Sequence, residues 1–197
     1  MFDASVNLRI IKLLAIGLLL LLSSCKNDIF RQKYDKLKSS KVEIPNNLLV
    51  LKTSEDTSNL SIKEGVRLVH YISQYECSEC AIAGIYRYEK LYELSKETNK
   101  FKLLIIISTP PEVVDYMIGV IKKECNNKGI IFPIYVDANN EFFLSNPQLP
   151  ADPRLHTFLI DTKGVPIIIG NPLDNKKIWS LYVEYLYSEQ PYMYNVK

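Results

Sequence analysis

Two cysteines separated by two residues, in the segment Cys77-Ser78-Glu79-Cys80, have the residue type and spacing for redox chemistry. Thiols at this spacing can close into a disulfide and open again. They follow an apolar run over 68–72 and precede a helix-like stretch. A helix start stabilises a thiolate, because its backbone N–H groups are unpaired and its dipole is positive there. Cys77 is therefore the candidate nucleophile and Cys80 the candidate resolving thiol.

The first residues have the features of an export signal. A weakly basic start leads into an apolar run over 13–22, which is too short to span a bilayer. The run ends in Leu22-Ser23-Ser24-Cys25, which resembles the lipobox of bacterial lipoproteins. This resemblance implies that residues 1–24 are removed and that Cys25 is lipidated, with palmitate, and anchors the chain in a bilayer. The alternative is an ordinary signal peptide that leaves Cys25 as a free thiol.

Export of this kind would place the protein in the bacterial cell envelope, anchored to the inner or the outer membrane with its domain outside the cytoplasm. That compartment permits disulfides and contains machinery that makes and breaks them. Removal of two basic residues and one acidic residue with the signal lowers the net charge from +2 to +1. Nucleic-acid binding calls for a clustered, strongly basic face, so we expect no nucleic-acid partner.

The remaining cysteine, Cys125, has a pattern typical of a core residue. It falls in phase with Val114, Ile118 and Ile121 on an expected helix, which predicts burial. A disulfide between Cys77 and Cys80 would therefore leave Cys125 as a structural thiol.

The chain divides into a leader, a spacer and one domain. Residues 25–46 are polar and rich in lysine, which predicts a tether. Residues 47–188 are enough for a single domain with a sizeable core, and 189–197 form a tail.

Hydrophobic patterning and turn residues predict alternating strands and helices within the domain. Thr109 is the expected cap of the second helix, and Pro166 should place the last strand at a sheet edge. A polar stretch with several prolines, 137–153, is expected to be irregular. The expected strands cover 48–51, 68–72, 103–107, 130–136, 157–160 and 165–169, and the expected helices 78–97, 110–125 and 175–187.

In this order the chain resembles the thioredoxin superfamily and, within it, the tethered extracytoplasmic branch often called TlpA-like. The cysteine pair after a strand carries the resemblance, together with Phe158-Leu159-Ile160-Asp161 before Lys163-Gly164 and the closing amphipathic helix. It implies an α/β fold of thioredoxin type, with a central mixed β-sheet flanked by helices. It also implies that Cys77 attacks a partner disulfide and that Cys80 resolves the mixed disulfide, with no cofactor. The implied partners are exported proteins or an apocytochrome with disulfides, and a membrane electron donor.

The chain departs from the family pattern at three positions near the dithiol. Glu76 replaces an aromatic residue, Tyr71 replaces a buried acid, and Leu155 followed by His156 stands where a cis proline is expected. Each of Glu76 and Glu79, at about 7 Å and an effective dielectric near 40, would disfavour the thiolate by about 1 kcal/mol. The helix start acts in the opposite direction, so we expect a modestly lowered thiol pKa and a reductant rather than a strong oxidant.

His156 has three possible roles. Its unperturbed pKa suits a proton carrier for Cys80. It could instead complete a metal site with Cys77 and Cys80, although three ligands leave a tetrahedral site incomplete. It could also pack in the sheet as a structural residue. The departures from the family pattern leave three functions open: a thiol-disulfide oxidoreductase, a non-catalytic binding module in which the disulfide is static, and a copper or zinc carrier.

Overall fold

A computed structural model describes residues 28–51, 64–76 and 78–188 of the chain. Several sequence predictions therefore lie outside the described residues: the signal peptide, the lipidation site Cys25, the nucleophile Cys77 and the tail 189–197. The chain divides into two compact units, 1–36 and 37–197. Residues 28–38 are helical. Within the described part of the chain, no helix is long and apolar enough to cross a membrane.

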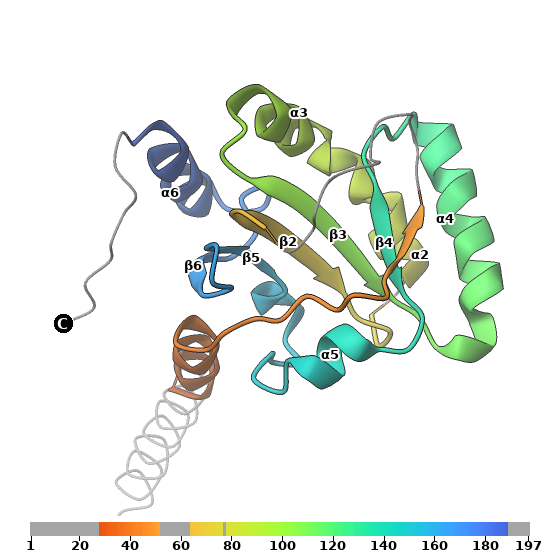
Figure 1. Cartoon of the computed structure of the whole chain (residues 1–197), viewed down its shortest axis with the longest axis horizontal. Helices are drawn as coiled ribbons and strands as arrows, with labels where there is room; N and C mark the ends of the chain where they lie inside the picture. Colours follow the sequence, from red (N-terminus) through yellow and green to blue (C-terminus); the bar gives the residue numbers. More distant parts are fainter. Residues whose placement is uncertain (1–27, 52–63, 77, 189–197) are drawn as a thin grey trace, which may run out of the picture. The chain divides into compact units, whose positions relative to one another are not determined.

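A six-stranded sheet, with the strand order β1-β4-β3-β2-β5-β6, forms the centre of the second unit (Figure 1). Strands β2, β3 and β4 are parallel to one another, whereas β1 and β5 are antiparallel to their neighbours and β5 and β6 form a hairpin. The strands are β1 (Leu49–Leu51), β2 (Arg67–Ile72), β3 (Lys102–Ser108), β4 (Ile134–Asp137), β5 (Thr157–Ile160) and β6 (Pro166–Ile169). The predicted mixed sheet is confirmed, and Pro166 does begin an edge strand.

Helices connect the parallel strands, because parallel neighbours need a long crossover connection. The helices α2 and α3 link β2 to β3, and α4 links β3 to β4. The last described element, α6, follows the β5–β6 hairpin. The helical elements are α2 (Ser78–Ala83), η1 (Ile85–Tyr88), α3 (Glu89–Thr98), η2 (Pro111–Val113), α4 (Val114–Lys128), α5 (Glu141–Ser145), η3 (Pro153–Leu155) and α6 (Lys176–Tyr187).

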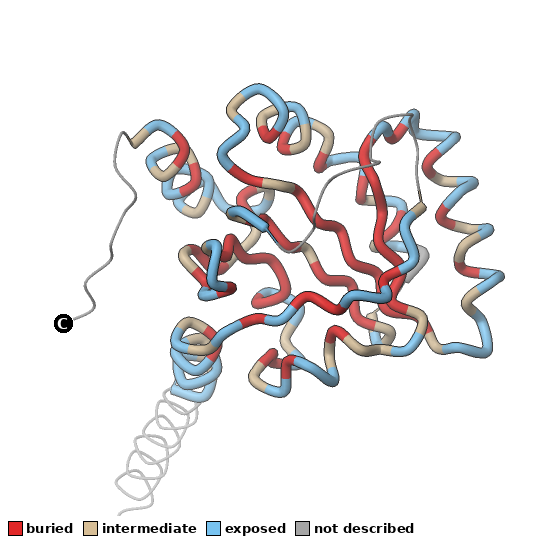
Figure 2. The backbone as a smooth tube through the Cα atoms, viewed as in Figure 1, coloured by how far each residue is buried: buried red, intermediate tan, exposed pale blue. Residues whose placement is uncertain are grey.

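The main hydrophobic core lies on the face of the sheet that α2, α3, α4 and α6 cover, and Figure 2 shows the sheet as the buried centre of the fold. Strand β3 is buried from Leu103 to Ser108, so the prediction of a central strand covered on both faces is confirmed. Cys125, on α4, is 6% exposed and belongs to this core. Its predicted structural role therefore agrees with its position.

The prediction of one continuous helix over 78–97 is wrong. The chain forms α2, then a 3₁₀ turn, then α3, with the Gly84 N–H bonded to the Ala81 carbonyl at 3.1 Å. This tighter turn ends α2 after six residues. Glycine also has low helix propensity, which favours a break at this place. The helix that follows the cysteine pair is consequently short.

The predicted cap at Thr109 is also wrong. The Thr109 backbone N–H donates to the Asp137 carbonyl at 3.0 Å, and its buried hydroxyl Oγ1 has no hydrogen-bond partner among the described residues. The following turn is a 3₁₀ helix, and α4 begins only at Val114. Strand β4 similarly starts at Ile134, because Pro133 cannot donate to the sheet.

The packed unit begins earlier than the boundary at residue 47 expected from sequence. Leu37, Val42 and Ile44 are at most 6% exposed. The Val42 N–H donates to the Gly164 carbonyl at 2.8 Å, in the turn between β5 and β6. Gly164 has φ of 90°, and a Cβ there would lie 2.5 Å from the Val42 carbonyl oxygen. The hairpin turn therefore needs glycine, and residues 37–46 are part of the domain.

Candidate active site

The candidate site lies at one edge of the sheet. The three parallel strands end at this edge, and β5 begins there because it is antiparallel to β2. Two backbone hydrogen bonds tie these segments together: the Tyr71 N–H donates to the His156 carbonyl at 2.9 Å, and the Thr109 N–H donates to the Asp137 carbonyl. Segments after β2, β3 and β4 therefore meet the segment before β5, where side chains from distant parts of the sequence can act together.

Cys80 is exposed and lies in the first turn of α2, which begins at Ser78. The helix starts directly after the loop that follows β2, as the sequence predicted. Cys77 immediately precedes Ser78 in sequence and lies outside the described residues. Cys80, the predicted resolving thiol, is thus on the surface after the end of β2, where a partner can reach it.

His156, the third predicted residue, is 3% exposed and uses both ring nitrogens. Nε2 lies 2.7 Å from the Pro150 carbonyl oxygen, and Nδ1 lies 2.9 Å from Oε1 of Glu76. Its backbone N–H donates to the Pro153 carbonyl at 3.0 Å. The ring is therefore fixed beside the residue that precedes Cys77.

Glu76 is held as firmly as its partner. Its Oε1 accepts from the Ser73 N–H at 3.0 Å, and its own N–H donates to the Ser73 carbonyl at 3.0 Å. Burial by itself would raise the pKa of Glu76, but the hydrogen bonds from His156 and from the Ser73 amide outweigh it and lower the pKa. Glu76 is therefore an ionised, partly buried carboxylate.

The hydrogen bonds fix the proton count of this pair. A carbonyl oxygen can only accept, so Nε2 of His156 donates to Pro150. An ionised Glu76 also only accepts, so Nδ1 must donate as well, and the ring then carries a positive charge. The pair in this geometry is an ion pair, with one proton more than a neutral imidazole and a carboxylate would hold.

Tyr71 lies six residues before Cys77, where the resemblance described from the sequence implies a buried acid. It is 1% exposed, and its hydroxyl donates to Oδ1 of Asn140 at 3.3 Å. Burial raises the pKa of Tyr71 to about 12, so the side chain stays neutral near pH 7. Its ring centroid lies 5.2 Å from that of His156. Tyr71 therefore packs against the ion pair and does not replace the missing carboxylate.

His70 points to the opposite face of β2, because neighbouring residues of a strand alternate. Its ring stacks on Tyr88 at 4.6 Å between centroids, and Nδ1 lies 2.8 Å from the Thr157 hydroxyl. Burial lowers the pKa of His70 to about 4. The expected structural role of His70 agrees with these contacts.

A metal ion would require His156 to give up an existing hydrogen bond, since both nitrogens are engaged. Among the described residues, no group of three or more His, Cys, Asp or Glu side chains could hold a metal. The full trio of the metal prediction includes Cys77, which lies outside them. The geometry of His156 favours pairing with Glu76 instead.

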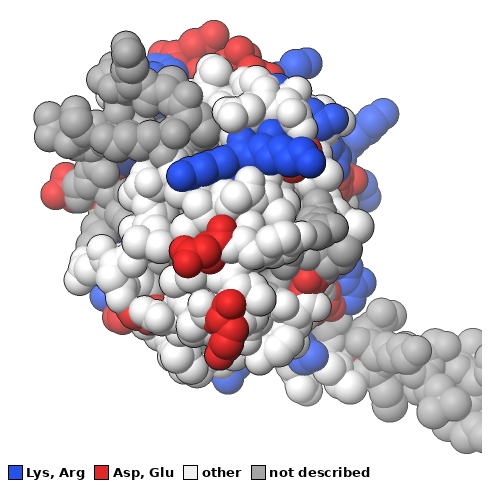
Figure 3. Space-filling view, turned by 90° about the vertical axis from the view of Figure 1, so that its right-hand side faces the viewer, with Lys and Arg blue, Asp and Glu red and all other residues white. Residues whose placement is uncertain are grey.

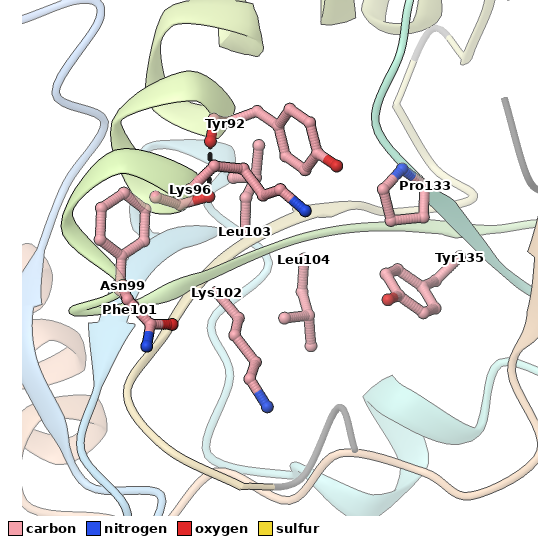
Figure 4. Close-up of a pocket in the computed structure, with 10 residues that line it drawn as sticks. Tyr92, Lys96, Asn99, Phe101, Lys102, Leu103, Leu104, Pro133 and Tyr135 are labelled. Atoms are coloured by element: carbon pink, nitrogen blue, oxygen red, sulfur yellow. Dashed lines mark hydrogen bonds between the residues drawn. The ribbon is translucent and has the colours of Figure 1, made fainter. Parts of the chain in front are cut away.

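A cavity of about 190 Å³ lies far from this edge, at the starts of β3 and β4 (Figure 4). Lys102, Leu104, Pro133 and Tyr135 are among the residues that line it. A strand of seven residues such as β3 is roughly 20 Å long, so the cavity is remote from Cys80. It takes no part in the candidate site.

The arrangement of the elements decides the fold. A β2–helix–β3 unit with parallel strands is followed by the antiparallel β5–β6 hairpin, which lies beside β2, and by a closing helix. A dithiol motif after β2 completes the pattern. The chain has a thioredoxin-like fold. Strand β4, with α4 before it and α5 after it, is an addition between the two halves of the thioredoxin-like pattern, and β1 pairs with its outer edge.

Comparisons with solved structures find thioredoxin-like proteins at low sequence identity. A thioredoxin-like protein in its oxidized form is 18% identical with a TM-score of 0.49, and the match covers 77% of this chain and 96% of that one. The thioredoxin domain of a thiol-disulfide oxidoreductase from Bacteroides vulgatus is 16% identical, with a TM-score of 0.43 and coverage of 63% and 81%. A thiol:disulfide interchange protein from Chlorobium tepidum is 16% identical, with a TM-score of 0.44 and coverage of 73% and 97%.

No protein-family model and no curated protein matches the sequence. At TM-scores below 0.5 the structural likenesses do not decide the fold, which the strand order and connections of this chain establish.

Proposed function

We propose that this protein is a lipid-anchored, extracytoplasmic thiol-disulfide oxidoreductase that reduces protein disulfides through Cys77 and Cys80. One observation supports it most: Cys80 is exposed in the first turn of a helix that begins one residue after Cys77, at the end of β2 in a thioredoxin-like fold. The Cys80 thiol is accessible at this position, and Cys77 is the residue that immediately precedes the helix in sequence.

The reaction is a two-step exchange that balances in electrons and protons. The Cys77 thiolate attacks one sulfur of a partner disulfide, so a Cys77–partner bond forms and the other partner sulfur leaves as a thiolate. The Cys80 thiolate then attacks the Cys77 sulfur, which closes the Cys77–Cys80 disulfide and releases the second partner thiolate. Two electrons pass to the partner, and the two protons of the dithiol end on the partner thiols. A membrane electron donor that carries a dithiol would return the two electrons.

The reducing direction follows from weak stabilisation of the thiolate. Helix α2 has only six residues, so few peptide dipoles add at its start. Glu79, two residues after Cys77 in sequence, adds a negative charge to the motif. A dithiol whose reduced form gains little stability tends to give up electrons rather than take them.

Exposed aromatic side chains would help to bind a polypeptide substrate. Tyr75, two residues before Cys77, is 81% exposed, and Tyr116 near the start of α4 is 62% exposed. Aromatic rings are common at protein interfaces because they offer large apolar area with a polar tip. Figure 3 views the side on which α4 lies in Figure 1 and shows a row of basic groups in the upper half and, below this row, uncharged surface interrupted by acidic groups. These features fit a partner bound through apolar contacts, such as an exported protein or an apocytochrome.

The test is to trap the mixed disulfide in cells. Replacing Cys80 with alanine removes the resolving thiol, so partners should accumulate on Cys77 and appear as bands that a reductant removes. The Cys77→Ala/Cys80→Ala variant is the matched control and should trap none. If no partner is trapped and the parent's Cys77–Cys80 bond resists mild reductant, the chain is a non-catalytic binding module and the proposal fails.

The anchor has a separate test. The Leu22-Ser23-Ser24-Cys25 motif supports lipidation of Cys25 in the cell envelope. Cys25→Ser should move the protein from the membrane fraction to the soluble fraction or leave the signal uncleaved. An unchanged membrane fraction, with a cleaved signal, would contradict lipidation at Cys25.

A further inference from the structure

The carboxylate next to the nucleophile is paired with a residue 80 positions away in sequence. His156 Nδ1 lies 2.9 Å from Glu76 Oε1, and the two side chains are 3% and 22% exposed. Glu76 immediately precedes Cys77. A change in the charge of this pair is therefore a change at the residue next to Cys77 in sequence.

His156 is held in place independently of Glu76. Its ring donates to the Pro150 carbonyl, and its backbone is bonded at both ends, to Pro153 and to Tyr71. The Tyr71 ring packs against it and is neutral near pH 7 because burial raises the pKa of the phenol. These contacts orient the imidazole without any contribution from Glu76, so His156 is preorganised to bind the carboxylate.

An unpaired carboxylate beside Cys77 would oppose ionisation of the thiol. At about 7 Å and an effective dielectric near 40, one negative charge lowers the thiolate population roughly fivefold. A carboxylate that shares its charge with an imidazolium is close to neutral as a pair, and its effect on a neighbouring thiol is much smaller.

We propose that His156 is a positioning and charge-compensating residue for the dithiol, which holds the Glu76 carboxylate and cancels its negative charge so that the Cys77 thiolate is not suppressed. The inference rests on the proposed function, in which Cys77 is the nucleophile. It assigns to Glu76 a role different from the simple acidic flank expected from sequence.

The experiment is a double-mutant cycle on the reduced, full-length protein. The pH dependence of alkylation by iodoacetamide, followed by mass spectrometry of the Cys77 peptide, reports the ionisation of that thiol. His156→Ala leaves Glu76 unpaired and should lower the Cys77 alkylation rate near pH 7 about fivefold. Glu76→Gln/His156→Ala removes the charge as well and should restore the parent rate.

Two further variants separate charge from shape. His156→Gln can still donate one hydrogen bond to Glu76 but has no charge, so it should remain slow, and Glu76→Gln in that background should again restore the rate. His70→Gln is the matched control, because His70 bonds Thr157 on the other face of β2 and should leave the rate unchanged.

The inference is overturned if Glu76→Gln fails to restore the rate in both histidine variants, or if His156→Gln reacts like the parent. The cycle uses a small alkylating agent and no disulfide partner, so its outcome is independent of the trapping experiment. Trapped partners with a failed cycle would contradict this role of His156 alone. An intact cycle, with no trapped partner and a Cys77–Cys80 bond that resists mild reductant, would contradict the proposed function alone.

Discussion

The two histidines of the chain show how burial and hydrogen-bond partners set the charge of one residue type. His156 faces two acceptors, the Glu76 carboxylate and the Pro150 carbonyl, so both of its ring nitrogens are placed to donate. His70 faces the Tyr88 ring and the Thr157 hydroxyl, and burial there favours the neutral form. The first can compensate a charge, and the second is a source of instability in acid.

Acid should destabilise the fold through His70. Burial, partly opposed by Glu76, lowers the pKa of His70 from 6.5 to about 4, so the unfolded chain binds this proton more readily than the folded chain. The stability contributed by neutral His70 is complete above pH 6.5 and is lost as the pH falls towards 4, at a cost of about 3 kcal/mol. Urea unfolding of the parent and His70→Gln at pH 7.5 and 4.5 measures the difference. Equal pH dependence of the two unfolding free energies would contradict it.

The sequence predicts the individual site residues better than their pairing. The position of the motif predicts that Cys80 lies in the first turn of a helix. Helix phase predicts the burial of Cys125. Glu76 looks like an acidic flank in sequence, because its partner is 80 residues away and is brought near only when β5 pairs with β2. One sequence signal could have suggested the ion pair: Glu76 directly precedes the first cysteine, and His156 directly precedes the first strand of the hairpin.

At the level of elements, α5 shows how a side chain can start a helix that patterning does not predict. The Asp137 carboxylate, 2% exposed, accepts from the Glu141 N–H and the Phe142 N–H, each at 2.9 Å. These bonds satisfy two backbone donors at the start of α5. The helix has five residues within a polar segment that contains several prolines, which is too short for a clear hydrophobic period. The irregular segment expected over 137–153 therefore contains a capped helix.

Removing this cap should be costly. Asp137→Ala leaves two backbone N–H groups at the start of α5 without their acceptor, so we expect a loss of about 2 kcal/mol in the free energy of unfolding. Asp137→Asn keeps one acceptor oxygen and should lose less. Chemical denaturation of the three proteins measures both effects. If Asp137→Ala were no less stable than Asp137→Asn, the cap would not contribute as described.

At the scale of the molecule, alternation of strands and helices predicts most of the sheet. Parallel strands need helical crossovers, so the order of elements limits the topology to few arrangements. Burial of Val42 and Ile44 does not follow from the composition of their segment, which is mostly polar and rich in lysine. Tertiary hydrogen bonds hold it instead: Asn146 bonds both the N–H and the carbonyl of Glu43, each at 2.8 Å. The tether predicted from polarity ends at residue 46, whereas the second compact unit already begins at Leu37.

The measurement that tests the central claim most directly is the reduction potential of the Cys77–Cys80 pair in the purified protein, obtained by equilibration with dithiol buffers of known potential. The account predicts a disulfide that opens and closes reversibly, with a potential well below the value of about −120 mV for strong periplasmic oxidants. A potential near that value would contradict the reducing role, and a pair that does not exchange at all would contradict the redox function.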